Sequence, residues 1–300
     1  MTNRPKRLPI IVAVDNHYII LLAALIKSIE ENNRSGLPID LYVISEKVSR
    51  LNVNKLENSI NKSMTSIFWY EMEDIITSDY KVPVDWTTFP RNIHARLFIP
   101  LFIPDFIEYI LYLDVDMIVC RDIAELFEIE IGENIVGAVL DQHVHTFSNN
   151  WGGIKNYKQL GLTPNSKYFN TGLLMINCKA WREFGVTKKV IECIKHNKQY
   201  ANFPDQYGLN VVLAERWKEF DPLWNYFSLD NEKKPYLIHF VKRKPIYKSY
   251  NGNMLFKQLF VNYLEKTMWK GEPEVSEIMR YCKKLSNVLN KVKYALLTIL

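Results

Sequence analysis

The stretch YILYLDVDMIVC (109–120) decides the fold. A run of apolar and aromatic residues leads into Asp114, Val115 and Asp116, and a second apolar run follows them. A continuous apolar run of this kind is typical of a β-strand that is buried on both faces of a parallel sheet. The run LPIIVAV (8–14) near the N-terminus has the same character. A protein with several such strands, separated by helices, belongs to the α/β class.

Predicted strands and helices alternate through most of the chain. Further strand-like runs occupy 39–45, 66–72, 133–141, 168–177 and the start of 236–245. Helical spacing of apolar residues occupies 18–31, 47–62, 178–196 and 205–215. This alternation predicts a Rossmann-like sheet flanked by helices over residues 1–250, with a small helical C-terminal region over residues 251–300.

Composition and charge exclude several classes of protein. Hydrophobic residues make up 48% of the 300 residues and charged residues 24%, so the chain is not disordered. The net charge of +5 is too small to indicate nucleic-acid binding. The scattered cysteines, Cys120, Cys178, Cys193 and Cys282, are interpreted as reduced core residues. Because no secretory signal or membrane-spanning run is evident, we expect a cytoplasmic protein.

Asp114 and Asp116 carry the first chemical signal. They follow a buried strand, at the edge of the sheet where ligands bind in open α/β folds. Residues i and i+2 of a strand point the same way, so both carboxylates can reach one cation. Hard oxygen ligands suit Mg²⁺ or Mn²⁺, and such an ion would make a diphosphate a better leaving group. The alternative is a pair of solvated carboxylates at a strand end, because the D-x-D pattern is common by chance.

Two further groups of residues follow predicted strands. His239 lies in a late strand and precedes the basic run Lys242, Arg243 and Lys244. Imidazole is a frequent ligand of Mn²⁺-type ions, and the basic run could hold phosphate oxygens. The alternatives are a histidine with an ordinary hydrogen-bond partner and a solvated turn.

The first strand is followed by Asp15, Asn16, His17 and Tyr18. A carboxylate and an aromatic ring at this position could hold a nucleotide base by a hydrogen bond and by stacking. A helix N-cap is an equally good reading of these residues. No glycine-rich fingerprint occurs here, which argues against a dinucleotide or P-loop site.

Several short motifs occur in a fixed order along residues 8–250. They are VAVDNHY (12–18), HARL (94–97), YLDVDMIV (112–119), VLDQ (139–142), YFNTGLLMIN (168–177), PDQYGLN (204–210) and IHFVKRKP (238–245). Together they resemble the retaining glycosyltransferases of family 8, which include bacterial lipopolysaccharide glucosyl- and galactosyltransferases and glycogenin. The resemblance implies a GT-A fold, a UDP-hexose donor (glucose or galactose), Mn²⁺, and a glycan, glycolipid or glycoprotein acceptor.

The resemblance also implies roles for individual residues. Asp114, Asp116 and His239 match the metal ligands, and Asp205 and Gln206 match the pair nearest the anomeric carbon. The positions that would contact the donor are Asp15 at the uracil edge, Tyr18 stacked on its ring, Ala13 against the base, His17 at the ribose, Arg96 near the sugar and phosphate, Val115 within D-x-D beside Asp114 and Asp116, Asp141, Asn170 and Thr171 at the sugar, and Lys244 at the diphosphate. The loop HFVKRKPI (239–246) departs from the usual pattern, because it lacks the glycine that follows HF in similar proteins.

Retention of configuration leaves two mechanisms open. A double displacement needs a carboxylate nucleophile, for which Asp205 is the candidate, with Gln206 nearby. In a front-face reaction, which we favour, the departing diphosphate helps to deprotonate the acceptor hydroxyl while the protein supplies positioning and electrostatic stabilisation. Two other functions compete: a haloacid-dehalogenase-like phosphatase, which also uses D-x-D after an apolar run, and a catalytically inactive protein that only binds UDP-sugars.

The C-terminal segment 278–300 has a pattern of its own. Apolar residues recur at three-and-four spacing, and the other faces carry lysine and arginine without any acidic residue. The pattern is typical of a basic amphipathic helix on an anionic membrane surface, which predicts peripheral contact with the inner face of the cell membrane. The alternative is a helix packed on its own domain. Among the tryptophans, Trp181 is predicted to be core, and Trp151 is a better candidate than Trp224 to stack on an acceptor sugar.

Overall fold

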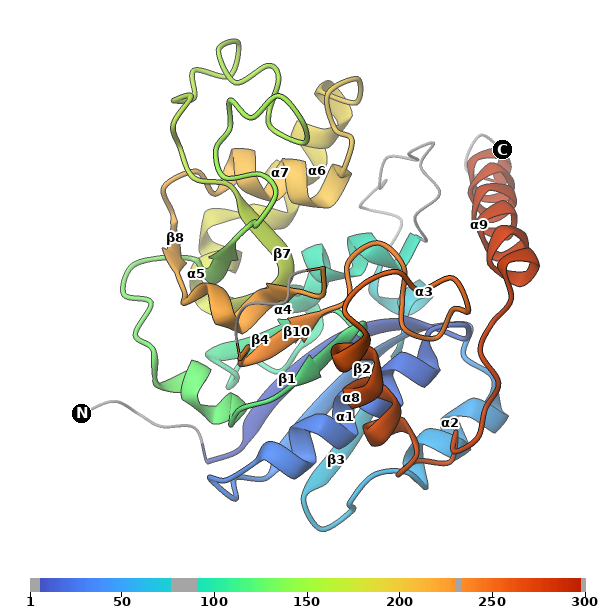
Figure 1. Cartoon of the computed structure of the whole chain (residues 1–300). Coiled ribbons are helices and arrows are strands. Elements are labelled where there is room, and N and C mark those ends of the chain that lie inside the picture. The colour runs from blue at the N-terminus through green and yellow to red at the C-terminus, as the bar shows by residue number, and fades with distance from the viewer. Residues whose placement is uncertain (1–5, 77–90, 230–233, 298–300) are drawn as a thin grey trace.

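The protein, seen as a computed structural model, is described over residues 6–76, 91–229 and 234–297, without the side chains of 91 and 294–297 (Figure 1). Within these ranges, seven strands form one mixed sheet in the order β3-β2-β1-β4-β7-β6-β8. They are β1 (Leu8–Asp15), β2 (Ile39–Glu46), β3 (Thr65–Glu71), β4 (Tyr109–Leu113), β6 (Val136–Leu140), β7 (Phe169–Asn177) and β8 (Trp217–Glu219). Strands β1 to β4 run parallel, β7 is antiparallel to β4 and β6, and β8 is parallel to β6. The predicted α/β class is confirmed.

A second, three-stranded sheet crosses the end of the first. It consists of β5 (Met117–Val119), β10 (Leu237–His239) and β9 (Tyr226–Phe227). The prediction of one strand over 109–120 is therefore wrong, because β4 ends at Leu113 and β5 belongs to the other sheet. The backbone switches partners between them: Asp114 N donates to Gly172 O at 2.8 Å, whereas Phe240 N donates to Asp116 O at 2.9 Å.

Helices cover both faces of the main sheet. They are α1 (Ile19–Asn32), α2 (Arg50–Glu57), α3 (Met72–Ile75), α4 (Ile99–Phe102), α5 (Cys178–Phe184), α6 (Val186–His196), α7 (Pro204–Val212), α8 (Met254–Leu264) and α9 (Glu277–Leu297), with 3₁₀ segments η1 (Arg91–Phe98), η2 (Ile123–Glu128) and η3 (Pro222–Asn225). The predicted helix over 178–196 is divided at Gly185, whose left-handed backbone (φ 68°) ends α5. Only glycine adopts this conformation without steric cost.

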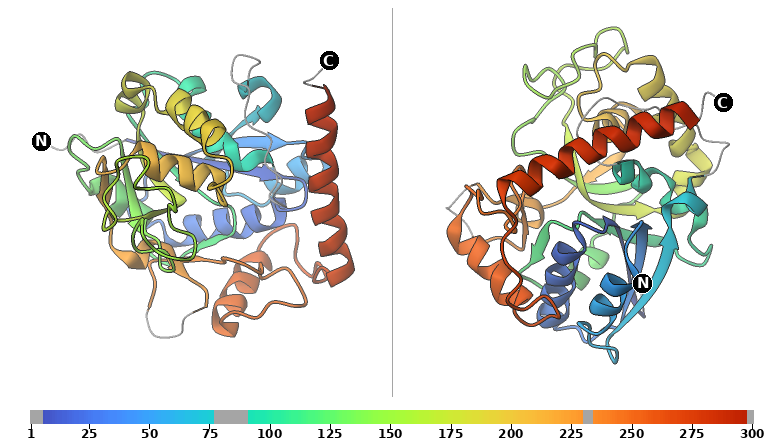
Figure 2. Two further views of the ribbon diagram at one scale, coloured as in Figure 1. Left: turned by 90° about the horizontal axis from the view of Figure 1, so that it is seen from above. Right: turned by 90° about the vertical axis from the view of Figure 1, so that its right-hand side faces the viewer.

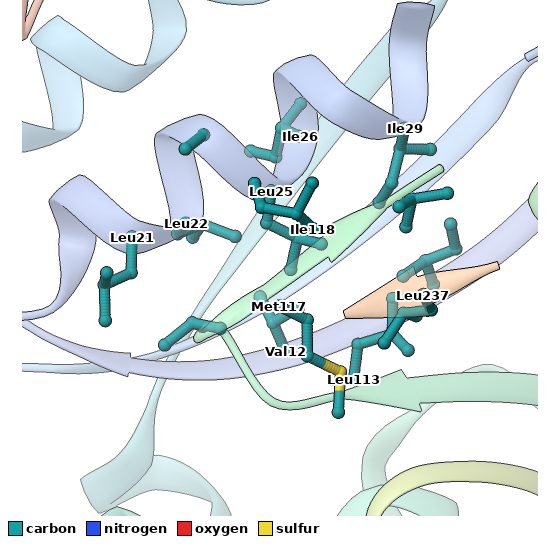
Figure 3. Packing of buried hydrophobic residues seen from close by; sticks show 14 of the residues in the cluster. Val12, Leu21, Leu22, Leu25, Ile26, Ile29, Leu113, Met117, Ile118 and Leu237 are labelled. Carbon is teal, nitrogen blue, oxygen red and sulfur yellow. The ribbon is translucent and has the colours of Figure 1, made fainter. Parts of the chain in front are cut away.

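Helix α1 anchors the strands that carry the site. Its buried side chains, including Leu22, Leu25 and Ile29, pack against Val12 of β1 and Ile118 of β5 (Figure 3). Burial of each such side chain stabilises the fold by about 1.5–3 kcal/mol. This packing fixes the carboxyl ends of β1 and β4 beside each other, at the edge where their polar residues follow.

The C-terminal region joins the main core through α8, whose Phe260 and Leu264 are buried in the same cluster as α1. Helix α9 then crosses the face of the molecule seen in the right-hand view of Figure 2. Within the described ranges, no helix is long and apolar enough to span a membrane. All four cysteines lie within the described ranges and are free. Cys282 on α9 is exposed and is not the core residue that was predicted.

Candidate active site

Asp114, Asp116 and His239 meet between the two sheets. His239 Nε2 lies 3.4 Å from Asp116 Oδ1 and 3.9 Å from Asp114 Oδ2, and one ligand atom from each residue lies within 4.8 Å of the others. Two ligands of one Mg²⁺ ion, each bound at about 2.1 Å, can be about 4.2 Å apart at most. Both histidine distances fit a shared ion. The three residues can therefore hold a divalent metal. The two carboxylates do not lie on one strand, because Asp114 and Asp116 belong to the connection between β4 and β5.

Lys244 lies against one of these carboxylates, that of Asp116. Its ammonium pairs with Asp116 Oδ2 and donates to the carbonyl of Phe240. Burial opposes ionisation of Asp116, but Lys244 and His239 outweigh it and hold the pKa of this carboxyl well below its usual range. The loop that carries Lys244 turns at Lys242, whose φ of 64° lies in the region that favours glycine. Lys242 thus adopts the turn conformation although this loop lacks the glycine of similar proteins. The turn brings Lys244 to the site.

Arg96 connects Asp114 to Asp205. Its guanidinium lies 3.0 Å from Asp114 Oδ1 and 3.2 Å from Asp205 Oδ2, and it also donates to the carbonyl of Thr171 at 2.6 Å. Burial works against this charge, yet Asp114 and Asp205 raise the pKa of Arg96 above its ordinary value. Tyr112 OH donates to Asp114 Oδ1 at 2.6 Å and was not predicted, although its position two residues earlier on β4 points it the same way.

A second cluster lies at the ends of β6, β7 and α7. Gln206 accepts from the backbone N–H of Thr171 at 3.2 Å and donates to Asp141 Oδ2 at 3.2 Å. Asn170 donates to the same carboxylate oxygen at 3.0 Å. The residues predicted to contact the donor sugar are therefore brought together. Asn225, which the sequence did not indicate, joins this cluster to His239 through hydrogen bonds to Asn170 and to the imidazole.

The predicted base-binding residues form a third group at the end of β1. Asp15 Oδ1 accepts from the backbone N–H groups of His17 and Tyr18, both at 2.9 Å. This is a turn ahead of α1 and not the predicted alternative of a helix N-cap, because the N-cap residue is Tyr18 and has no side-chain cap hydrogen bond. Both side chains bond to Tyr247 OH, at 2.9 Å from His17 and 3.1 Å from Tyr18. Lys283 of α9 lies 2.6 Å from Asp15 Oδ2. Neither Tyr247 nor Lys283 was predicted to lie here.

The remaining predicted residues differ in their exposure. Ala13 is half-buried on β1, and Val115, which stands between Asp114 and Asp116 in the sequence, is buried. Trp181 is fully buried, as predicted, and Trp224 is also core. Trp151 is 61% exposed, with its ring centre 6.3 Å from that of His143. Trp151 alone of these three tryptophans is available to a sugar.

Residues 9–254 match the profile of Glycosyl transferase family 8. General stress protein A of Bacillus subtilis is 26% identical over 89% of this chain and 97% of its own length. Glycosyltransferase GlyF of Streptococcus pneumoniae is 26% identical over 83% of this chain, which spans only 59% of GlyF.

Solved structures share the fold. Galactosyltransferase LgtC, solved with donor and acceptor sugar analogs, superposes with a TM-score of 0.73 at 20% identity, over 88% of this chain and 99% of LgtC. The bifunctional glycosyltransferase WbbM gives a TM-score of 0.71 at 23% identity, over 89% of this chain and 51% of WbbM. The fold is thus the GT-A fold that the sequence predicted. The family match also overrules the phosphatase alternative. Because the match extends over most of its length, the chain belongs to glycosyl transferase family 8 and is a glycosyltransferase.

Proposed function

We propose that this enzyme transfers a hexose, glucose or galactose, from a UDP-sugar to a glycan, glycolipid or glycoprotein acceptor, with Mn²⁺ dependence and retention of anomeric configuration. The observation that carries the proposal is the Arg96 bridge, which ties Asp114 of the metal-binding cluster to Asp205 near the sugar-side cluster. A donor diphosphate on the metal would place its sugar beside Asp205 and Gln206.

Each group of residues has a task in this proposal. A divalent ion held by Asp114, Asp116 and His239 would neutralise the charge that develops on the departing diphosphate. Lys244, already drawn into the site by Asp116, would contact the same phosphate oxygens. Asp15 and Tyr18 would hold the uracil.

The sugar-side contacts favour the front-face reaction. The Asp205 carboxylate is buried and paired with Arg96, which lowers its readiness to attack a carbon atom. The Gln206 amide oxygen accepts from Thr171 and Asn170, so its place is fixed. In this reading, the acceptor hydroxyl attacks the anomeric carbon and passes its proton to the leaving diphosphate oxygen on the same face. The protein contributes position and charge stabilisation.

The exposed ring of Trp151 supports an acceptor site near the start of α7, which carries Asp205 and Gln206, since the ring contacts Phe203 just ahead of that helix. We also propose peripheral membrane contact through α9. Its described apolar residues Ile278, Leu285 and Leu289 are 76%, 61% and 59% exposed. The last predicted members of this stripe, Leu296 and Ile299, lie outside the described side chains.

Release of UDP from a panel of UDP-sugars, with Mn²⁺ or with EDTA and without acceptor, tests the proposal. We expect slow hydrolysis of UDP-glucose or UDP-galactose that stops in EDTA, because water can replace the acceptor. The sugar that is hydrolysed identifies the donor.

If no UDP were released from any UDP-sugar of the panel, even with an acceptor mixture of simple sugars, the result would contradict the proposed catalysis. Calorimetric binding of UDP without turnover would then favour the inactive UDP-sugar-binding protein. An Asp205→Asn variant that keeps most of its kcat would exclude the double displacement.

A further inference from the structure

We propose that Asn225 is a positioning residue that holds His239 ready to bind metal and, with the same amide group, holds Asn170 on the sugar side. The proposal rests on the metal and sugar roles assigned above. Asn225 ends η3 and is 1% exposed, and His239 is 5% exposed. A buried polar group that lacks a hydrogen-bond partner costs free energy. Each donor at this site must therefore face an acceptor, which defines the direction of each bond.

The direction of each bond follows from one backbone group. Gly172 N–H, which can only donate, lies 2.9 Å from Asn170 Oδ1 and fixes that atom as the amide oxygen. The Asn225 atom 2.9 Å from the same oxygen must then be its NH₂ group. The other amide atom of Asn225, its oxygen, therefore faces His239.

The orientation of Asn225 sets the state of the histidine. Asn225 Oδ1 lies 2.9 Å from His239 Nδ1, and an oxygen here requires Nδ1 to carry the proton. In the neutral imidazole, Nε2 then has the free lone pair, and Nε2 is the atom that faces Asp114 and Asp116. Partners of this kind fix the tautomer and ring orientation of metal-binding histidines.

Gly172 lies in close contact with His239 and Asn170. A Cβ added to this glycine would lie 2.6 Å from His239 Cε1 and 3.0 Å from Asn170 Oδ1. The backbone of β7 thus packs directly against both side chains that Asn225 joins. Asn225 connects the two halves of the site through contacts that leave little freedom to either.

Calorimetric Mn²⁺ binding to Asn225→Leu and Asn225→Asp tests the proposal without relying on turnover. Asn225→Leu removes both hydrogen bonds, and we expect its Mn²⁺ affinity to fall about 10- to 100-fold. Asn225→Asp keeps an acceptor for His239 Nδ1–H, so its Mn²⁺ affinity should stay near that of the wild type. Both variants should release UDP more slowly, because Asn170 loses a donor.

Asn156→Leu is the matched control, since it removes a buried amide that bonds to Tyr207 and Asn197 in another cluster. Its Mn²⁺ affinity should not change. Equal Mn²⁺ affinity in Asn225→Leu and wild type, or equal loss in both Asn225 variants, would overturn the proposal. A wild-type protein that binds no Mn²⁺ would instead refute the metal site itself.

A different contact supports a second inference: we propose that α9 is an autoinhibitory latch on the base-binding end of the donor site. This second inference rests on the proposal that Asp15 binds the uracil base of the donor. Asp15 Oδ2 is buried, and its partner among the described residues is the Lys283 ammonium, 2.6 Å away. The helix start is also fastened to the loop of Lys244, through Glu277 and Arg243 at 3.1 Å. A base that bonds to Asp15 must displace Lys283.

Helix α9 is oriented with its polar side inward. Arg280, Asn287 and Lys291 are buried, while Leu285 and Leu289 on the apolar side are exposed. We assign an anionic lipid surface as the occupant of this apolar side. Exposed Lys284 and Lys293 flank it, and no acidic residue follows Glu277, so two copies of α9 would repel each other. Lipid that binds α9 would draw Lys283 off Asp15.

Calorimetric titration of UDP with Mn²⁺ tests the latch on the 300-residue chain. We expect Lys283→Ala to bind UDP about two- to fivefold more tightly than wild type, given the strength of a partly exposed ion pair. The matched control Lys284→Ala changes the neighbouring exposed lysine and should bind as wild type does. Vesicles of phosphatidylglycerol should tighten UDP binding to wild type but not to Lys283→Ala.

If Lys283→Ala bound UDP as tightly as wild type or more weakly, the result would overturn the latch. If no variant bound UDP, the result would refute the proposed donor site. The same titration with Leu285→Gln/Leu289→Gln should show no effect of vesicles. Vesicles that leave wild-type binding unchanged, or α9-dependent dimers by light scattering, would overturn lipid as the occupant.

Discussion

Asp116→Asn is expected to abolish detectable Mn²⁺ binding and to slow metal-dependent UDP release about 10³-fold. The substitution removes a charged ligand and leaves the ammonium of Lys244 without its partner. A loss of several kcal/mol of electrostatic stabilisation at the leaving group corresponds to a rate loss of this size. Mn²⁺ calorimetry and UDP release on the same preparation give both values.

Asp40→Asn is the control for the loss of one carboxylate. Asp40 pairs with Arg7 at 2.7 Å on the surface, and such a pair contributes only about 0–1 kcal/mol. This variant should keep its metal binding and its activity. If Asp116→Asn released UDP within tenfold of the wild-type rate and still responded to EDTA, the D-x-D residues would not be the metal site.

Arg96→Met is expected to lower the free energy of unfolding by about 3–5 kcal/mol and to reduce UDP release strongly. The substitution leaves Asp114 and Asp205 in a buried site without the cation between them, and an uncompensated buried charge carries a cost of this order. Urea unfolding in EDTA measures the first effect. Added Mn²⁺ should restore part of the stability, because it neutralises Asp114.

Arg96→Lys separates charge from geometry. One ammonium cannot bridge both carboxylates as the planar guanidinium does, so stability should recover more than activity. An Arg96→Met protein within 1 kcal/mol of wild type would contradict the bridging role that the proposed function depends on.

Most of the main sheet could be predicted from the sequence. Runs such as LPIIVAV (8–14) are buried on both faces in the structure, and continuous apolar runs report this burial directly. The division of 109–120 into two strands could not be predicted. Both halves are equally apolar, and the exchange of partners at Asp114 and Asp116 depends on β7 and β10, which are distant in sequence.

The site residues were predicted unevenly for a similar reason. Asp114, Asp116 and His239 stand at strand ends and belong to recognisable motifs, so their meeting could be anticipated. Asn225 is the last residue of the short 3₁₀ segment η3, which has no periodic pattern, and its role arises only from contacts to Asn170 and His239.

The amphipathic character of α9 was predicted, and so was an apolar side available to a membrane, but the contacts that hold its polar side against the protein were not. Periodicity shows that one side of a helix is apolar and says nothing of which side faces the protein. Here the ion pair of Lys283 with Asp15 and the burial of Lys291 turn the polar side inward.

Calorimetric titration of UDP into the wild-type protein over a series of Mn²⁺ concentrations, with EDTA as the zero point, tests the central claim most directly. The account predicts that UDP affinity rises with Mn²⁺ and is lost in EDTA. By linkage, Mn²⁺ should bind more tightly when UDP is present. UDP binding that is equal with Mn²⁺ and with EDTA would contradict the claim that Asp114, Asp116 and His239 form a metal site for the donor diphosphate.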